Sequence, residues 1–194
     1  MEGMKMTDKL GCEVVRGREV SGDLHMVGHY KFFHHRGGKL LALRENHNVV
    51  TSEGKQHILS SALDNGTRKT AWYVALVTGD GPPPAPSASH VYATFFNSVV
   101  VEFQDYSSGS GNTERKLYDG VVSADKITNV AARASFTITT TTKAVHGAAL
   151  VSHITKGNHA AGDILMSWAD LTGGEIAVQI NDVLNIEIEL SFTA

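Results

Sequence analysis

The C-terminal end of the chain constrains the fold most strongly, because apolar and polar side chains alternate there without interruption. Between residues 183 and 193, the apolar set Ile186, Ile188, Leu190 and Phe192 alternates with the polar set Asn185, Glu187, Glu189 and Ser191. Successive side chains of a strand point to opposite faces, so this segment has one buried and one solvated face. The pattern is typical of a strand in an antiparallel sheet.

Shorter β-prone runs, separated by glycine and polar turns, occupy much of the remaining chain. They cover residues 24–36, 39–44, 70–78, 99–106, 134–142, 145–154, 164–168 and 175–180. Gly37-Gly38 lies between the first two runs, which indicates a hairpin. Strands and helices do not alternate, which disfavours a doubly wound α/β fold. The sequence therefore predicts a mainly β fold, an antiparallel β-sandwich or jelly-roll-like barrel.

One short helix is predicted after the second run. Thr51-Ser52-Glu53 supplies a hydroxyl cap and an acidic first turn, and Gly66 stands just beyond the expected end. Between them, Ile58, Leu59, Ala62 and Leu63 recur at helical spacing. We expect a helix of about 13 residues. No second segment has a comparable pattern.

The first 22 residues differ from the rest, because they are polar, contain glycine and show no periodicity. We predict an extended N-terminal arm over 1–22 and a single β-sandwich domain over 23–194. An extended arm can add to a neighbouring sheet through main-chain hydrogen bonds, or it can fold back on its own domain. The candidate interface residues are Met4, Met6, Leu10, Val14, Val15, Val20, His34 and His35.

Composition excludes several functional classes. Cys12 is the only cysteine, so no internal disulfide can form. No run of about 18 apolar residues and no signal-peptide-like core occurs, which argues against a membrane span and a secretion signal. The net charge is −3 and no basic stripe is visible, so we expect no direct contact with nucleic acid.

Ten histidines suggest a metal site, but their spacing argues against one. On a strand, His25 and His29 share a face and lie roughly 13 Å apart, whereas His34 and His35 point to opposite faces. Imidazoles at such separations do not converge on one ion. We therefore expect surface or interface histidines, and no metal or cofactor. At a subunit contact they would make assembly sensitive to pH.

The search for a catalytic group is also negative. The chain has no Gly-x-Ser-x-Gly elbow, and Cys12 has no acid or base placed near it. Glu187 and Glu189 are about 7 Å apart, but they lie on the polar face of the last strand and should be solvated. Gly79-Asp80-Gly81 precedes three prolines, where a phosphate-binding helix would have to begin. We predict a protein that is not an enzyme and has no catalytic residues.

Several short motifs resemble those of a group of phage structural proteins. They are Val50-Thr51-Ser52-Glu53-Gly54, residues 70–76, Glu102 to Ser107, Arg115, Ile127 to Ala131, Ser135 to Ile138, Gly147 to Ser152, Thr155-Lys156-Gly157 and Gly162 to Leu165. The resemblance covers roughly residues 48–194. The family pattern has Ser-His-x-Gly-Trp near Ser89-His90, and this chain departs from it with Val91-Tyr92-Ala93.

The resemblance implies a virion protein, made in the host cytoplasm, that acts as head decoration, capsid cement or a tail-associated component. It implies the major capsid protein and copies of this chain as partners, and no active site. We expect a capsid cement or decoration protein. The alternatives are a tail- or fibre-associated protein and a surface carbohydrate-binding module. In that module Trp72, Tyr73 or Trp168 would stack on sugars, although both tryptophans lie in apolar strands and are expected in the core.

Overall fold

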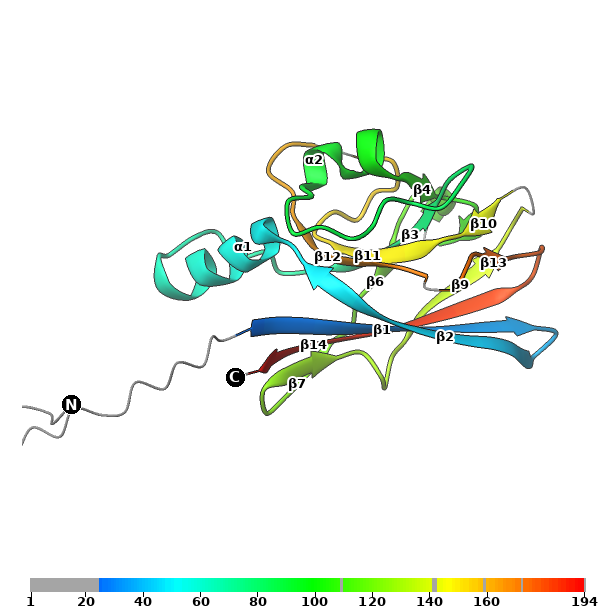
Figure 1. Cartoon of the computed structure of the whole chain (residues 1–194), viewed down its shortest axis with the longest axis horizontal. Helices are drawn as coiled ribbons and strands as arrows, with labels where there is room; N and C mark the ends of the chain where they lie inside the picture. Colours follow the sequence, from blue (N-terminus) through cyan, green and yellow to red (C-terminus); the bar gives the residue numbers. More distant parts are fainter. Residues whose placement is uncertain (1–24, 109, 141–142, 159, 172, 194) are drawn as a thin grey trace, which may run out of the picture.

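The computed structural model describes residues 25–108, 110–140, 143–158, 160–171 and 173–193 (Figure 1). The predicted arm lies outside these residues. The same holds for six of the candidate interface residues, namely Met4, Met6, Leu10, Val14, Val15 and Val20.

The described chain consists mainly of short antiparallel strands. The strands are β1 (His25–Arg36), β2 (Lys39–Val50), β3 (Tyr73–Thr78), β4 (Val101–Phe103), β5 (Tyr106–Ser107), β6 (Lys116–Leu117), β7 (Val121–Ser123), β8 (Lys126–Thr128), β9 (Ala134–Ile138), β10 (Ala144–Val145), β11 (Gly147–Val151), β12 (Leu165–Asp170), β13 (Ile176–Ala177) and β14 (Val183–Thr193). The helical segments are α1 (Ser52–Leu63), α2 (Tyr92–Thr94), the π-helical η1 (Phe95–Val99) and the 3-10 turn η2 (Ser110–Asn112).

Twelve strands form one antiparallel sheet that curls into a half-barrel (Figure 1). The main path runs β4-β3-β11-β12-β2-β1-β14-β8-β7, with β5, β6 and β9 paired to its sides. Strand β2 belongs to both halves, because it pairs with β1 along most of its length and with β12 at Val49 and Val50. The predicted mainly antiparallel β fold is confirmed. Its two facing layers come from one curled sheet rather than from two separate sheets.

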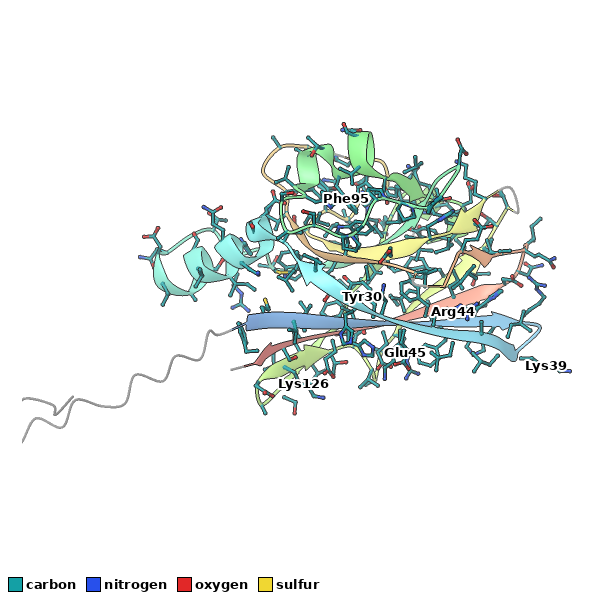
Figure 2. The ribbon with its side chains drawn as sticks, in the orientation of Figure 1. Tyr30, Lys39, Arg44, Glu45, Phe95 and Lys126 are labelled. Atoms are coloured by element: carbon teal, nitrogen blue, oxygen red, sulfur yellow. The ribbon has the colours of Figure 1, made fainter. Side chains whose placement is uncertain are left out.

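The main core lies between the two halves of the curled sheet. Tyr30 and Phe32 of β1 face Val74 of β3 and Leu150 of β11 across it. Figure 2 shows Tyr30 in this space, and its hydroxyl lies 2.9 Å from Ser167 Oγ of β12. Burial of these side chains supplies most of the stabilisation, at roughly 1.5–3 kcal/mol for each large apolar residue.

Strand β14 follows the predicted alternation over most of its length. Leu184, Ile186, Ile188 and Leu190 are all buried in the main core. Phe192 was expected on the same buried face, and this prediction is wrong, because its side chain is 40% exposed. It lies at the end of the sheet, beyond the last core residue of the strand.

A second, smaller core covers the far face of β3, β11 and β12. Trp168 of β12 packs there against Phe95, with ring centroids 5.2 Å apart. The covering layer is formed by α2 and η1, for which the sequence has no helical pattern. This layer explains why β3 and β11 are apolar without alternation, since both faces of each strand are buried.

The predicted helix is confirmed as α1. Thr51 is its N-cap, and the Thr51 hydroxyl accepts a hydrogen bond from the Gly54 amide at 3.0 Å. The helix packs on β12 through Gly54, where an added Cβ would lie 2.5 Å from the Met166 carbonyl oxygen. Leu63 is 82% exposed, so the apolar stripe covers the core only in part. Within the described part of the chain, no helix has the length and apolar character needed to cross a membrane.

Candidate protein-interaction site

A groove opens into the main core where β1 begins and α1 packs over the sheet. It has a volume of about 770 Å³. Its apolar lining comes from segments that are far apart in the sequence and consists of Met26, Ile58, Trp72, Leu117, Val122 and Ile127, among others. Such a volume is in the range of pockets that bind ligands or segments of a partner protein. The curled sheet therefore leaves its core incompletely covered at this end.

The rim of the groove is polar. His57 and Lys69 lie on the α1 side, and Asp119 lies on the opposite side in the link between β6 and β7. Partial burial lowers the pKa of His57, and the nearby Lys69 lowers it further. The Lys69 ammonium is itself paired with Asp163 at 3.1 Å. An apolar floor with a polar rim is the arrangement found in protein interfaces.

The hairpin of β1 and β2 provides a second exposed surface. Its turn is the predicted Gly37-Gly38, and both glycines have positive φ (55° and 78°), as a tight two-residue hairpin turn requires. Among the described strands, only β1 pairs with β2 between Lys39 and Asn48. The other edge of β2 is thus an open sheet edge there, and Figure 2 shows Lys39 at its free end. Open edges are templates for pairing with another chain.

Three leucines are exposed on this same open strand. Leu40 is 53%, Leu41 52% and Leu43 44% exposed. A short edge strand in a monomeric protein usually carries charged side chains that oppose pairing. Here Lys39 and Arg44 flank the leucines, so the edge combines unpaired main-chain groups with apolar side chains. We call this surface, Lys39 to Glu45, the β2 edge.

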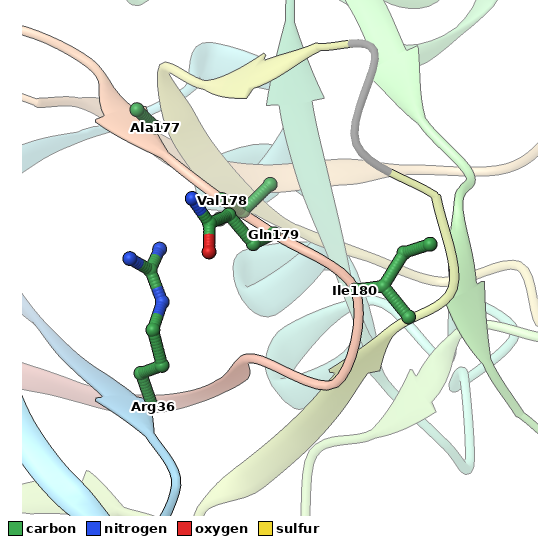
Figure 3. Close-up of a pocket in the computed structure, with 5 residues that line it drawn as sticks. All are labelled: Arg36, Ala177, Val178, Gln179 and Ile180. Carbon is green, nitrogen blue, oxygen red and sulfur yellow. The ribbon is translucent and has the colours of Figure 1, made fainter.

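The hairpin is held in place by a buried carboxylate. Asp182, just before β14, accepts hydrogen bonds from Arg36 Nε and Nη2, each at 2.8 Å. His34 Nε2 lies 2.8 Å from the same carboxylate, and the main-chain N–H of Gln179 also donates to it at 2.8 Å. Figure 3 shows the pocket of about 580 Å³ beside this contact, lined by Arg36 and residues 177–180. His34, a candidate interface residue, is thus buried and bound within its own chain.

Replacing Asp182 with asparagine should lower the free energy of unfolding by about 1–2 kcal/mol at pH 7. The loss is smaller than for a fully buried ion pair, because solvent screens the partly exposed Arg36. The Arg36 and His34 hydrogen bonds lower the pKa of Asp182. Because the pKa is lower in the folded protein, the ionised Asp182 stabilises the fold at pH values above the ordinary carboxyl pKa. This stabilisation decreases as the pH falls below about 4. Urea unfolding at pH 7 and pH 3 measures the loss. Asp119→Asn, on an exposed loop, is the control. A destabilisation by Asp182→Asn that is larger at pH 3 than at pH 7 would contradict the assignment.

Further histidines lie in β1 and β2, and His57 lies in α1. His29 lies beside His47 of β2, with ring centroids 5.3 Å apart, and its Nε2 is 3.4 Å from Glu45 Oε2. His35, the second candidate interface histidine, is partly exposed and contacts Asn185 at 3.4 Å. Within the described ranges, no three side chains of the metal-binding types converge. The pairing of His29 with His47 had no signal in the spacing of the sequence.

The prediction that Glu187 is solvated is wrong. Its side chain is buried, and it is paired with Arg133 Nη2 at 2.7 Å and Lys31 Nζ at 3.5 Å. Arg133 also lies over the Phe33 ring, at 4.4 Å from its centroid. Glu189 is paired with Lys126 at 2.9 Å. Ion pairs, rather than free carboxylates, therefore cover the outer face of β1 and β14.

Several motifs that carry the resemblance meet in a buried ionic network. The Arg115 guanidinium donates to both carboxylate oxygens of Glu102, at 2.7 Å and 2.9 Å. It also donates to the Tyr92 hydroxyl at 2.7 Å, and the Gly157 amide donates to Glu102 at 2.7 Å. Both charged side chains are almost completely buried. The network joins the α2 layer, β4 and the loop after β11.

Lys156 extends this network. Its ammonium donates to the carbonyl oxygens of Gln104 and Tyr106, at 2.9 Å and 2.8 Å, and lies 3.6 Å from the Tyr106 ring centroid. Burial lowers the pKa of Lys156 to about 8. A lysine with a lowered pKa is a candidate base, but the hydrogen bonds of Lys156 are made to the carbonyls of its own chain. We therefore assign these residues to the framework of the fold.

The aromatic side chains expected in a sugar-binding module differ in exposure. Trp168 is buried, and its Nε1 donates to His90 Nδ1 at 2.9 Å. Trp72 and Tyr73 are partly exposed, and Trp72 makes an edge contact with His57 in the groove, at 5.6 Å between centroids. Both tryptophans were predicted to lie in the core. This is confirmed for Trp168 and in part for Trp72, which is partly buried and packs against the main core.

Comparison with known proteins assigns no family to the chain. No family model, no curated protein and no solved structure matches it. The groove and the β2 edge are therefore interpreted from their own geometry.

Proposed function

We propose that this protein is a structural component of a phage particle, namely a capsid cement or decoration protein. It binds the major capsid protein and neighbouring copies of itself, and it acts through protein contacts rather than catalysis. The site of action is the virion. The proposal combines the motifs that resemble phage structural proteins with the exposed surfaces of the fold.

The observation that carries the proposal is the β2 edge. Main-chain groups on one side of this strand have no partner strand among the described residues, and Leu40, Leu41 and Leu43 are exposed beside them. A strand from another subunit can satisfy these groups, and its side chains can cover the leucines. Open strand edges and exposed apolar side chains both promote association. Their combination on one strand therefore favours a protein that binds other chains.

The rigidity of the surface supports the same function. The hairpin that presents the β2 edge is fixed by Asp182, and the Arg115–Glu102 network fixes the α2 layer to β4 and the loop after β11. A cement protein gains its effect by summing many interfaces, each of which should exceed about 1,000 Å² to be stable. A surface that is already ordered loses little entropy on binding.

Replacing Leu41 and Leu43 together with glutamate should reduce incorporation into particles about tenfold, because charges would be buried against the partner. Both positions are exposed, so the fold should be retained. Particles assembled in the presence of each variant are purified, and bound protein is quantified by mass spectrometry. The matched control is the double variant Leu59→Glu with Leu63→Glu, which places the same two charges on exposed leucines of α1. Equal incorporation of the two variants would contradict the proposal.

A tail- or fibre-associated position is the second candidate, since the β2 edge would serve equally well in a symmetric ring. The copy number in purified particles separates the two positions: hundreds of copies indicate the shell, and a small symmetric number indicates the tail. The partial exposure of Trp72 in a groove favours, more weakly, a surface carbohydrate-binding module. Binding of the purified protein to a glycan array, abolished by Trp72→Ala, would support that third function.

A further inference from the structure

The groove at the open end of the half-barrel is a gap in the main core. Four apolar side chains are packed against this core yet only partly buried, and all four line the groove: Met26, Ile58, Trp72 and Ile127. Val122 lies beside them and is 72% exposed. Covering such a surface with apolar side chains is favourable by about 25 cal/mol per Å².

The gap is bordered by two open strands. Within the described residues, β6 pairs with β3 alone and β7 pairs with β8 alone. Leu117 of β6 and Val122 of β7 both line the groove, and the short link that includes Gly120 joins the two strands. An added strand would therefore find main-chain partners as well as apolar contacts at this place.

The chain itself contains a segment that suits this gap. Residues 1–22 carry Met4, Met6, Leu10, Val14, Val15 and Val20. Methionine adapts to irregular apolar surfaces, and valine is favourable in added strands. The segment is joined to β1 next to Met26, at the edge of the groove itself. Its 22 residues extend up to about 70 Å, enough to reach the groove of the same or of a neighbouring copy.

We propose that the groove binds the N-terminal segment of this protein, residues 1–22, which adds to the open edge of β6 or β7 and covers the exposed core. The inference goes beyond the proposed function and does not depend on it, because both partners belong to this chain. It assigns a binding surface, the groove, to the candidate interface residues within residues 1–22.

Cys12, the only cysteine of the chain, allows a direct test in the full-length protein. A second cysteine is introduced in the groove, as Val122→Cys or, in a separate variant, as Leu117→Cys. Mild oxidation should then join it to Cys12, since a disulfide forms only where the two Cα atoms approach within about 7 Å. Non-reducing gel electrophoresis shows a covalent dimer if a neighbouring copy supplies the segment, and an internally linked monomer if the same copy does. Either product supports the proposal.

The matched control is Ile180→Cys, which lies in the turn before β14, outside both the groove and the β2 edge, and is as exposed as Leu117. Cross-linking to Cys12 should be at least about tenfold faster for the groove variants than for this control, because binding raises the local concentration of the thiol. Adding Cys12→Ala should abolish the product, which excludes disulfides between two introduced cysteines. The unmodified protein, oxidised in the same way, should not give the product, which excludes disulfides between two Cys12 residues. Failure of both groove variants to cross-link, or equal rates in the groove variants and the control variant, would overturn the proposal, and neither result would bear on incorporation through the β2 edge.

Discussion

Replacing Arg115 with leucine is expected to lower the free energy of unfolding by about 3–5 kcal/mol, because it leaves the Glu102 carboxylate buried without its cation. The two side chains are joined by two short hydrogen bonds, and almost no solvent reaches either of them. The Tyr92 hydroxyl loses a partner at the same time. The Gly157 amide alone cannot compensate the carboxylate charge.

Chemical denaturation at pH 7 measures this loss. Arg133→Leu is the control, because it removes an arginine from a partly exposed ion pair and should cost less than about 1 kcal/mol. The double variant Arg115→Leu with Glu102→Met should recover much of the stability, since it leaves no unpaired charge. If Arg115→Leu cost no more than Arg133→Leu, the network would not have the structural role assigned to it.

Replacing Trp168 with alanine should cost about 3–5 kcal/mol, the range observed for deleting a large aromatic side chain from a packed core. Trp168 is completely buried and joins β12 to the layer formed by α2 and η1. The cavity left behind would lie between Phe95 and the sheet, and His90 would lose its indole donor. This layer should therefore loosen before the main core does.

Trp72→Ala provides the matched comparison, because the chain has only these two tryptophans. Trp72 is partly exposed in the groove, so its loss should cost about 1–2 kcal/mol. Thermal unfolding monitored by circular dichroism compares the two variants. Hydrogen exchange should show early loss of protection in residues 92–99 for Trp168→Ala alone. Equal destabilisation by the two substitutions would mean that the second core contributes little.

Local patterns in the sequence were sufficient to predict several elements. The alternation in β14, the Thr51 cap of α1 and the Gly37-Gly38 turn each depend on residues that are neighbours along the chain. Physical rules for strands, caps and turns apply directly to such segments. These predictions agree with the structure, apart from Glu187 and Phe192 of β14.

Features that depend on distant residues had no comparable signal. The segment 92–99 has no side-chain cap and consists largely of aromatic and β-branched residues, so its helical turns come from packing on β12. Glu187 was expected to be solvated because it lies on the polar face of an alternating strand. Its partner, Arg133, lies 54 residues away in the sequence, so the ion pair had no local signal. The curl of the sheet follows from β2 changing partners between β1 and β12, which no local pattern specifies.

The candidate site was predictable only in its broad character. Exposed leucines in residues 39–44 belong to a predicted strand, but the sequence does not indicate that one edge of that strand is open. The groove is assembled from residues of α1, β1, β6 to β8, β11, β12 and β14, which are dispersed between positions 26 and 190. Proximity between such segments is a property of the curled sheet, and it emerges only once strand order is known.

The long ladder between β1 and its neighbours has a mechanical consequence. A partner that pulls on the hairpin tip along the strand direction loads the β1–β14 and β1–β2 hydrogen bonds in shear, so that many must break at once rather than one after another. The ladder with β14 runs from His25 to His35, almost the whole length of β1. Because β2 continues into the second half of the sheet, the load passes into both halves. The hairpin can therefore serve as a tension-bearing anchor point.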